Sequence, residues 1–424
     1  MKEALVTSDN AHAPVNALQS EAQSGCLTRE IQPPSSLVPG RIVIAKTKEE
    51  VESLRNVWSS WRVHPNADID FYLLVLRSNR EIIQPHVIVL YRDEVPEAML
   101  VGRVVDSKIE TRLGYATLFR RSARTLVFVH GGQAGVLSSK NCEMLVASVI
   151  RSLSEGEADL AEFRFVRTDT ELYSAVSGLP GLLMRDHFPS LQSHWSLKLP
   201  PNAVDIYSKM STKSRKNLKW QAKKLKEQFG GSLEISLFSR KQDLDQMFAD
   251  IETVAKKTYH RALGFGFEDT PEMRQRMLLE AEKGWLRAYV LYLAGKPSAF
   301  WVGSVCDGKF HSCFLGYDDE HARFSPGIFL ITRVLEGLCS EGLEEVDFGL
   351  GDAEYKQRFG NQCWEDACIH IFANSPRGIG INALRTPGIV VRDVMKRVLA
   401  KMEIQDSLKK FWRDRAKNGS GASS

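Results

Sequence analysis

The alternation of apolar and polar positions predicts an α/β protein with two successive series of strands and helices. In the first series, helical spacing is found at 47–62 and 139–154. Short apolar runs, alternating or continuous, predict strands at 70–77, 86–92, 98–105, 125–130, 161–166 and 195–199. Pro200 and Pro201 then interrupt the chain, because two successive prolines favour neither a helix interior nor a central strand.

A second series of the same kind follows Pro201. Helices are predicted at 204–228, 240–259, 326–341 and near 353–359. The first of these is expected to be broken, with a new helix capped at Ser211 or Thr212. Strands are predicted at 232–238, 285–293, 297–306, 309–316, 345–349 and 366–373. Because hairpins occupy the middle of both series, we expect mixed sheets and a structural duplication, although no repeat is visible residue by residue.

These patterns divide the chain into four segments. Residues 1–40 are rich in Ser, Pro, Ala and Gln and are expected to form a disordered tail. Two mixed α/β domains are expected at 41–200 and 201–378. Residues 379–424 are expected to form a helical extension with a flexible end.

Composition excludes several classes of protein and changes the picture little. With 43% hydrophobic and 25% charged residues, the chain is neither collagen-like, mucin-like nor wholly disordered. No apolar run approaches the roughly 18 residues of a membrane-spanning helix, and the N-terminus lacks the apolar core of a secretory signal. The seven cysteines include no C-x-x-C pair, so we predict reduced thiols, a cytoplasmic location and no metal site.

The net charge of +4 is distributed unevenly, and this does change the picture. Residues 205–228 carry eight Lys or Arg and two Asp or Glu, and residues 385–417 carry ten and four. Each segment is therefore +6, and the rest of the chain is −8. In the first segment, pairing along one helix cannot neutralise the charge, because acids are too few. Two interpretations remain open: a solvated surface helix, or a wall that faces the phosphates of a coenzyme, a sugar nucleotide or tRNA.

Two motifs in the second series carry candidate chemistry. In the first, Ser325 is predicted to cap a helix that begins at Pro326. Gly327 would let an anionic ligand approach the free N–H groups of the first turn, and Arg323 would add a cation. The alternative is a well-capped helix without a ligand.

The second motif follows the predicted strand 345–349. Asp352, Tyr355, Lys356 and Arg358 come directly after this strand. Polar groups at the C-terminal end of a strand are where α/β sheets place ligand contacts. The alternative is an ordinary charged surface.

Four segments, taken in order, resemble a known family: 214–225, 285–303, 315–327 and 346–360. Together they resemble the GNAT acyltransferase domain of the cellulose-biosynthesis (CelD-like) or BioF2-like acetyltransferases, which are relatives of the Fem-type aminoacyl transferases. The most specific element is the string D-x-G-x-G-x-x-x-Y-K-x-x-F-G, which begins at Asp347. The resemblance covers about 205–373. Residues 41–200 match only in layout, as the degenerate first unit of a tandem GNAT pair would.

This resemblance implies a mixed sheet that is splayed in its middle and holds the thioester of acetyl-CoA or another acyl-CoA. It also implies that the coenzyme's pyrophosphate lies at the N-terminus of the helix after the fourth strand. The cofactor-binding residues are then Arg323, Ser325, Gly327 and Ile328. Pro326 and Ile328 stand where the family's loop has glycines, which leaves room for a different acyl donor.

Amide formation requires an amine to lose a proton, attack a thioester or ester carbonyl, and expel a thiolate or ribose oxygen. In GNAT folds a tyrosine after the fifth strand often protonates the leaving group, and Tyr355 occupies that place. Asp352 and Glu354 are the nearest candidate bases. The residues predicted to bind the substrate are Asp347, Lys356, Arg358, Arg215 and Lys219.

Three functional hypotheses follow. The first is an N-acyltransferase that moves an acyl group from acyl-CoA to a small-molecule amine, such as an amino sugar or amino acid in polysaccharide or envelope precursor synthesis. The second is a Fem-like transferase that takes an aminoacyl group from tRNA, with 205–228 and 385–417 as the RNA footprint. The third is a catalytically silent GNAT-fold binding module. The sequence does not determine the oligomeric state.

Overall fold

The computed structural model describes residues 40–61, 64–113, 116–208, 210–258, 261 and 266–386. The predicted tail at 1–40 lies outside the described residues except for Gly40, and so does the chain after 386, including most of the basic segment 385–417. The predicted helical extension is therefore described only in its first part, where residues 376–386 are helical. No helix in the described ranges is both long and apolar enough to cross a membrane.

One mixed sheet of twelve strands runs through the described part of the chain. The first half contributes β1 (Arg41–Ala45), β2 (Ile82–Arg92), β3 (Val95–Leu113), β4 (Ala116–Gly135), β5 (Leu160–Arg167) and β6 (Ser190–Lys198). The second half contributes β7 (Leu233–Phe238), β8 (Leu286–Leu293), β9 (Lys296–Cys306), β10 (Lys309–Tyr317), β11 (Glu345–Leu350) and β12 (Gln362–Phe372). The strand order is β1-β2-β3-β4-β5-β12-β6-β11-β10-β9-β8-β7. Counted inward from its own edge, each half has the same order: its first five strands, followed by the last strand of the other half.

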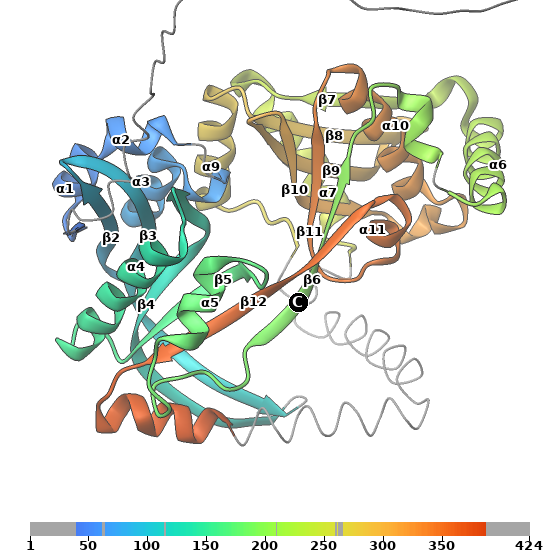
Figure 1. Ribbon diagram of the computed structural model, residues 1–424. Helices are drawn as coiled ribbons and strands as arrows, with labels where there is room; N and C mark the ends of the chain where they lie inside the picture. The colour runs from blue at the N-terminus through green and yellow to red at the C-terminus, as the bar shows by residue number, and fades with distance from the viewer. Residues whose placement is uncertain are drawn as a thin grey trace, which may run out of the picture. The chain divides into compact units, whose positions relative to one another are not determined.

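Each half gives its last strand to the other half. β6 pairs antiparallel with β11, and β12 pairs antiparallel with β5. The two exchanged strands also pair with each other, and they run side by side through the middle of Figure 1. The predicted fold class, a tandem pair of mixed α/β units, is therefore confirmed. The two units share one sheet, which continues across the predicted domain boundary at 200/201. The boundary itself stays a prediction.

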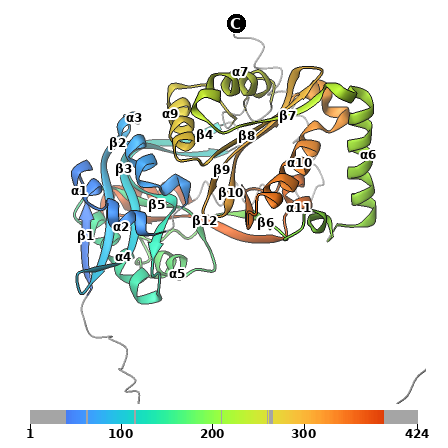
Figure 2. The same ribbon diagram turned by 90° about the horizontal axis from the view of Figure 1, so that it is seen from above.

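Helices cover both faces of this sheet. In the first half they are α1 (Lys48–Ser53), α2 (Arg55–Ser60), α3 (Ile69–Ser78), α4 (Ser139–Ser154) and α5 (Glu171–Gly178). In the second half they are α6 (Thr212–Phe229), α7 (Leu244–Ala255), α9 (Pro271–Glu282), α10 (Pro326–Ser340) and α11 (Glu354–Phe359). Short 3₁₀ turns, among them η1 (Pro65–Ala67), η2 (Ala203–Tyr207) and η5 (Asp319–Phe324), connect them. α6 packs against the outer side of α10 (Figure 2).

The prediction of a strand at 70–77 is wrong, because these residues belong to helix α3. A continuous apolar run cannot distinguish a buried strand from a buried helix. Here the helix is decided by its start: the Asp68 side chain accepts the Asp70 and Phe71 amides at 3.1 and 3.2 Å. Its buried side chains then recur at helical spacing: Ile69, Tyr72, Leu73 and Leu76.

Other elements differ in detail. The predicted break before α6 is confirmed, since Ser211 caps this helix by accepting the Ser214 amide at 3.1 Å. The sequence predictions include no helix at α5 or α9, although α5 buries Leu172, Ala175 and Val176 at helical spacing. α10 has an extensive apolar face: it buries Leu330, Val334 and Leu338 against the second half of the sheet. Each such side chain contributes about 1.5–3 kcal/mol.

Candidate active site

A hollow opens where β10 and β11 stop pairing. The two strands run parallel but pair only over 309–311 and 345–347. Beyond this point the register of β10 against β9 shifts between Ser312 and Phe314, and the register of β11 against β6 shifts before Gly349, whose φ is 71°. The strands therefore separate. The space between them is a hollow of about 440 Å³, lined by 312–315 and 348–353.

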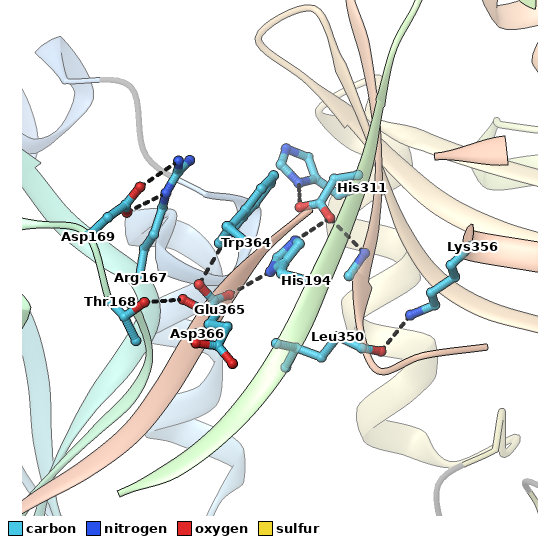
Figure 3. Close-up of polar contacts among 12 residues, drawn as sticks. Arg167, Thr168, Asp169, His194, His311, Leu350, Lys356, Trp364, Glu365 and Asp366 are labelled. Atoms are coloured by element: carbon cyan, nitrogen blue, oxygen red, sulfur yellow. Dashed lines mark hydrogen bonds and ion pairs between the residues drawn. The ribbon is translucent and has the colours of Figure 1, made fainter. Parts of the chain in front are cut away.

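Two predicted site residues from α11 lie on the wall of this hollow: Tyr355 and Lys356. Burial raises the pKa of Tyr355 well above its ordinary value, so its hydroxyl stays protonated at neutral pH and can donate. Lys356 is only 7% exposed, and its Nζ donates to the Leu350 carbonyl at 2.5 Å (Figure 3). Burial lowers the pKa of Lys356 to about 8, against the opposing effect of Asp347 and Asp352.

The predicted bases are placed differently from each other. Asp352 lines the same hollow and accepts hydrogen bonds from the Ser193 hydroxyl at 3.1 Å and the Trp195 indole at 3.0 Å. The Glu354 side chain is exposed and pairs with Arg358 across one turn of α11. Arg358 borders a separate hollow beside the start of α6. The structure thus brings Asp352, Tyr355 and Lys356 together and keeps Glu354 and Arg358 outside the hollow.

The start of α10 differs from the prediction. The helix begins at Pro326 as expected, but Ser325 adopts a left-handed conformation, with φ of 52°, and makes no capping hydrogen bond. The Ser325 hydroxyl instead accepts a hydrogen bond from the Gln221 amide of α6 at 3.1 Å. The prediction that Ser325 caps this helix is wrong, and the first turn keeps its N–H groups free of a side-chain cap.

The other predicted coenzyme residues surround this first turn. Gly327 faces the Tyr317 ring, which a Cβ would approach to 3.1 Å. The Arg323 guanidinium lies over the Phe324 ring, 4.7 Å from its centre. Ile328 lines a hollow of about 290 Å³ between α6 and α10 together with Arg215 and Lys219. Residues predicted from two separate motifs therefore share one hollow.

Sequence reasoning predicted Asp347 as a substrate-binding residue but missed the cluster of histidines and aspartates to which it belongs, at the seam between the two halves. Its members come from both halves: His64, His130, His194, His311, Asp347 and Asp366. His194 of β6 is 3% exposed and lies between two carboxylates (Figure 3). Its Nε2 is 2.6 Å from Asp347 Oδ1, and its Nδ1 is 2.6 Å from Asp366 Oδ2.

This arrangement is electrostatically coupled. Burial opposes a charge on His194, but the hydrogen bonds and charges of both carboxylates raise its pKa to about 9. Burial likewise acts against the charged form of Asp347, yet His194 and His311 hold the pKa of Asp347 well below its ordinary value. Trp364 stacks on His194 with ring centres 4.5 Å apart, and its indole donates to Asp366 at 3.0 Å. Together these contacts fix the His194 ring in one orientation.

The cluster borders a second hollow, of about 270 Å³, which is lined by His64, His130, His311 and Asp347. Burial lowers the pKa of His64 and of His130, so both rings are neutral at neutral pH. This hollow shares the backbone of 312–314 and 349–350 with the hollow between β10 and β11. The two spaces therefore meet at the same pair of strands, one on the α11 side and one at the seam.

Comparison with known proteins bears on these features. Residues 212–357, which include α6, β10, α10, β11 and most of α11, match the family model of the acetyltransferase (GNAT) domain. This segment is similar to a GNAT domain. The match confirms the superfamily that the sequence resembles, while the narrower CelD-like or BioF2-like family stays a prediction. No curated protein matches the chain at a significant level.

Several solved structures are similar to the structure of this chain, at low sequence identity. One is the C-terminal domain of a protein described as a lysylphosphatidylglycerol synthetase from Agrobacterium fabrum, with 14% identity, 81% of this chain and 96% of that chain covered, and a TM-score of 0.49. A second is FemX, with 11% identity, 78% and 97% covered, and a TM-score of 0.49. A third is a tandem GNAT protein from the clavulanic acid biosynthesis pathway, with 9% identity, 80% and 99% covered, and a TM-score of 0.44.

Proposed function

We propose that the protein is an N-acyltransferase that moves an acyl group, acetyl in the simplest case, from acyl-CoA to a small-molecule amine. The observation that carries this proposal is the hollow between β10 and β11, with the protonated Tyr355 hydroxyl and the buried Lys356 amine on its wall. The family match over 212–357 supports the same reaction class. An amino sugar or amino acid, of the kind used in polysaccharide or envelope precursors, is the acceptor we favour.

The donor would lie with its thioester between the two strands and its pyrophosphate at the first turn of α10. An uncapped helix start offers N–H donors to an anion. Arg215 and Lys219 of α6 border the adjoining hollow and would add charge-assisted contacts. The first turn of α10 is an imperfect site for the pyrophosphate, because Pro326 has no N–H and the Tyr317 ring covers Gly327. The side chains of α6 therefore have a larger share in holding the donor.

The chemistry assigns each group a step. The acceptor nitrogen attacks the thioester carbonyl, a C–N bond forms, and the C–S bond breaks. Tyr355 would give its proton to the leaving thiolate, and Lys356 Nζ would stabilise the negative charge on the carbonyl oxygen. Asp352, the one predicted base on the hollow, would accept the amine proton. Holding both reactants between rigid strands would supply much of the rate.

A Fem-like transfer from aminoacyl-tRNA is the second candidate, and one observation favours it. α6 presents seven Lys and Arg residues, and a single pair along the helix, between Lys223 and Glu227 at 3.6 Å, offsets them among the described contacts. Such a surface attracts polyanions, and its affinity for RNA would fall steeply as salt rises. Small-molecule coenzyme and tRNA would approach the same helix.

One experiment separates the hypotheses. Thermal unfolding is followed with acetyl-CoA, longer acyl-CoAs and charged tRNA, since a ligand at 100 times its Kd adds about 2.7 kcal/mol of stability. Release of free thiol is then measured with a panel of amino sugars and amino acids. Stabilisation by an acyl-CoA together with amine-dependent thiol release is the expected result. Stabilisation and transfer with charged tRNA alone would favour the Fem-like reaction, and no response to any donor would favour a silent module.

A further inference from the structure

The two carboxylate oxygens of Asp347 differ in their hydrogen bonds: Oδ1 accepts two short ones, and Oδ2 has one distant neighbour. Oδ1 accepts a hydrogen bond from His194 Nε2 at 2.6 Å and a second from the Gly349 amide at 2.7 Å. Within the described part of the chain, the hydrogen-bonding neighbour of Oδ2 is His311 Nδ1, at 3.4 Å. That distance is beyond the 2.7–3.2 Å range typical of such hydrogen bonds. The second oxygen therefore faces the seam hollow with a neighbour that is too distant for a good hydrogen bond.

The spacing of these two atoms suits a shared metal ion. Two ligands bound about 2.0–2.1 Å from a tetrahedral Zn²⁺ lie about 3.3–3.4 Å apart. Cis ligands of an octahedral ion at similar bond lengths lie only about 3.0 Å apart. The measured 3.4 Å between His311 Nδ1 and Asp347 Oδ2 matches the tetrahedral value.

A third ligand is in reach. The His64 ring lies 4.5 Å from the His311 ring, centre to centre, and one ligand atom from each of His64, His311 and Asp347 falls within 4.8 Å of the other two. His64 comes from the first half of the chain, whereas the other two belong to β10 and β11. Its Nδ1 accepts the Asn66 amide at 3.1 Å, a hydrogen bond that a bound ion would displace.

The surroundings resemble the outer shell of a metal site. Ligating carboxylates are usually held by hydrogen bonds on their second oxygen. Here the chain Asp347–His194–Asp366 does this, and Trp364 fixes its far end. The seam hollow of about 270 Å³ borders all three ligands, so a fourth position would stay open to water or substrate.

We propose that His64, His311 and Asp347 bind a Zn²⁺ ion at the seam between the two halves, with the fourth position open to the hollow. The site lies beyond the proposed acyl transfer, because no step of that reaction depends on the ion. It would join the halves directly, and it would place a Lewis acid beside β10 and β11.

The test measures metal binding without any acyl donor, so its result is independent of the transferase proposal. The purified chain is stripped with a chelator, titrated with Zn²⁺ alone, and separately loaded with Co²⁺, whose visible absorption is strong in tetrahedral sites. The wild type should bind one Zn²⁺ per chain and show the tetrahedral Co²⁺ spectrum. His64→Ala and His311→Ala should each weaken Zn²⁺ binding by at least tenfold.

The matched control is His321→Ala, which removes the histidine of a different group of possible ligands, Asp318, Glu320 and His321, and should leave binding unchanged. Melting temperatures in metal-free buffer check that each variant folds. If His311→Ala does not fold, Zn²⁺ binding is measured instead in His64→Asn, which changes the residue directly before the turn η1. The proposal is overturned by a wild type that binds no Zn²⁺ at micromolar concentration, by unchanged binding in the His64 variants, or by loss of binding in His321→Ala.

Discussion

The two halves of the sheet differ in the space beside two equivalent pairs of parallel strands, β4 with β5 and β10 with β11. In the first half β4 and β5 pair over 125–128 and 160–163, and the turn at His64 packs onto β4 just beyond. The packing is so close that a Cβ on Gly131 would come within 2.2 Å of the His64 Cβ. In the second half β10 and β11 separate, and the space beside Gly349 stays open. In the first half, the turn at His64 fills this space. In the second half, the same space is open and could hold a ligand.

The helices that follow these strands show the same difference. α4 is closed by its own residues: Ser138 caps it by accepting the Asn141 amide at 3.3 Å, and the Asn141 side chain donates to the Val136 carbonyl at 2.8 Å. α10 begins without a side-chain cap. A duplicated unit can thus keep its fold while one copy satisfies its polar groups internally and the other keeps them for a partner.

The largest expected effect concerns the filled position. Gly131→Ala would combine a left-handed φ of 70° with a clash against His64, and should lower the free energy of unfolding by about 3 kcal/mol or more. Gly349→Ala has a similar φ of 71° but open space around it, so only about 1–2 kcal/mol is expected. Urea unfolding of both variants measures the difference. Equal losses would contradict the contrast between a filled and an open half.

The second prediction concerns catalysis in the open half. Tyr355→Phe removes the proposed acid and should lower kcat about 100-fold with KM nearly unchanged. The matched control is Tyr173→Phe in α5, the corresponding helix of the first half, which should leave both constants as they are. Steady-state thiol release with acetyl-CoA and an accepted amine is the measurement. Unchanged turnover in Tyr355→Phe would remove this residue from the mechanism.

Sequence reasoning reaches furthest where residues are close along the chain. The string after β11 led to Asp352, Tyr355 and Lys356, which one strand and the following turn place on one hollow, while their catalytic roles stay predictions. The start of α10 was located to the residue, but not its cap, because the Ser325 hydroxyl accepts a hydrogen bond from Gln221 of α6, a contact that no local pattern reveals. The family likeness, rather than any periodicity, predicted the splayed sheet.

The seam could not be predicted. His194 and Asp366 are far apart in the sequence and meet because the exchanged strands β6 and β12 pair with each other. No motif or spacing marks such an exchange. The prediction of no metal site rested on cysteine spacing, which is silent about histidines brought together in this way.

A third prediction tests whether the open half binds its donor through α6. Reversing two charges, Arg215→Glu with Lys219→Glu, should raise the Kd for acetyl-CoA about tenfold at low salt, because both residues border the hollow beside α10. Lys223→Glu with Lys226→Glu changes the net charge equally but lies toward the other end of the helix, and should change Kd less than twofold. Calorimetric titration at low and high salt is the measurement. Equal effects of the two pairs would indicate a long-range field instead of contact.

The prediction with the smallest expected effect concerns how well the second half excludes water from the Lys356 amine. Its folded pKa of about 8 lies below the ordinary 10.5, so between these values the unfolded chain binds more protons and stability rises with pH. Relative to Lys356→Met, the wild type should gain about 1 kcal/mol between pH 8 and 9, and nothing between pH 6 and 7, where both states are charged. Urea unfolding of the two proteins at each pH gives this difference. A difference that stays flat to pH 9 would mean that water reaches the amine, and that the wall of the hollow is as wet as an ordinary surface.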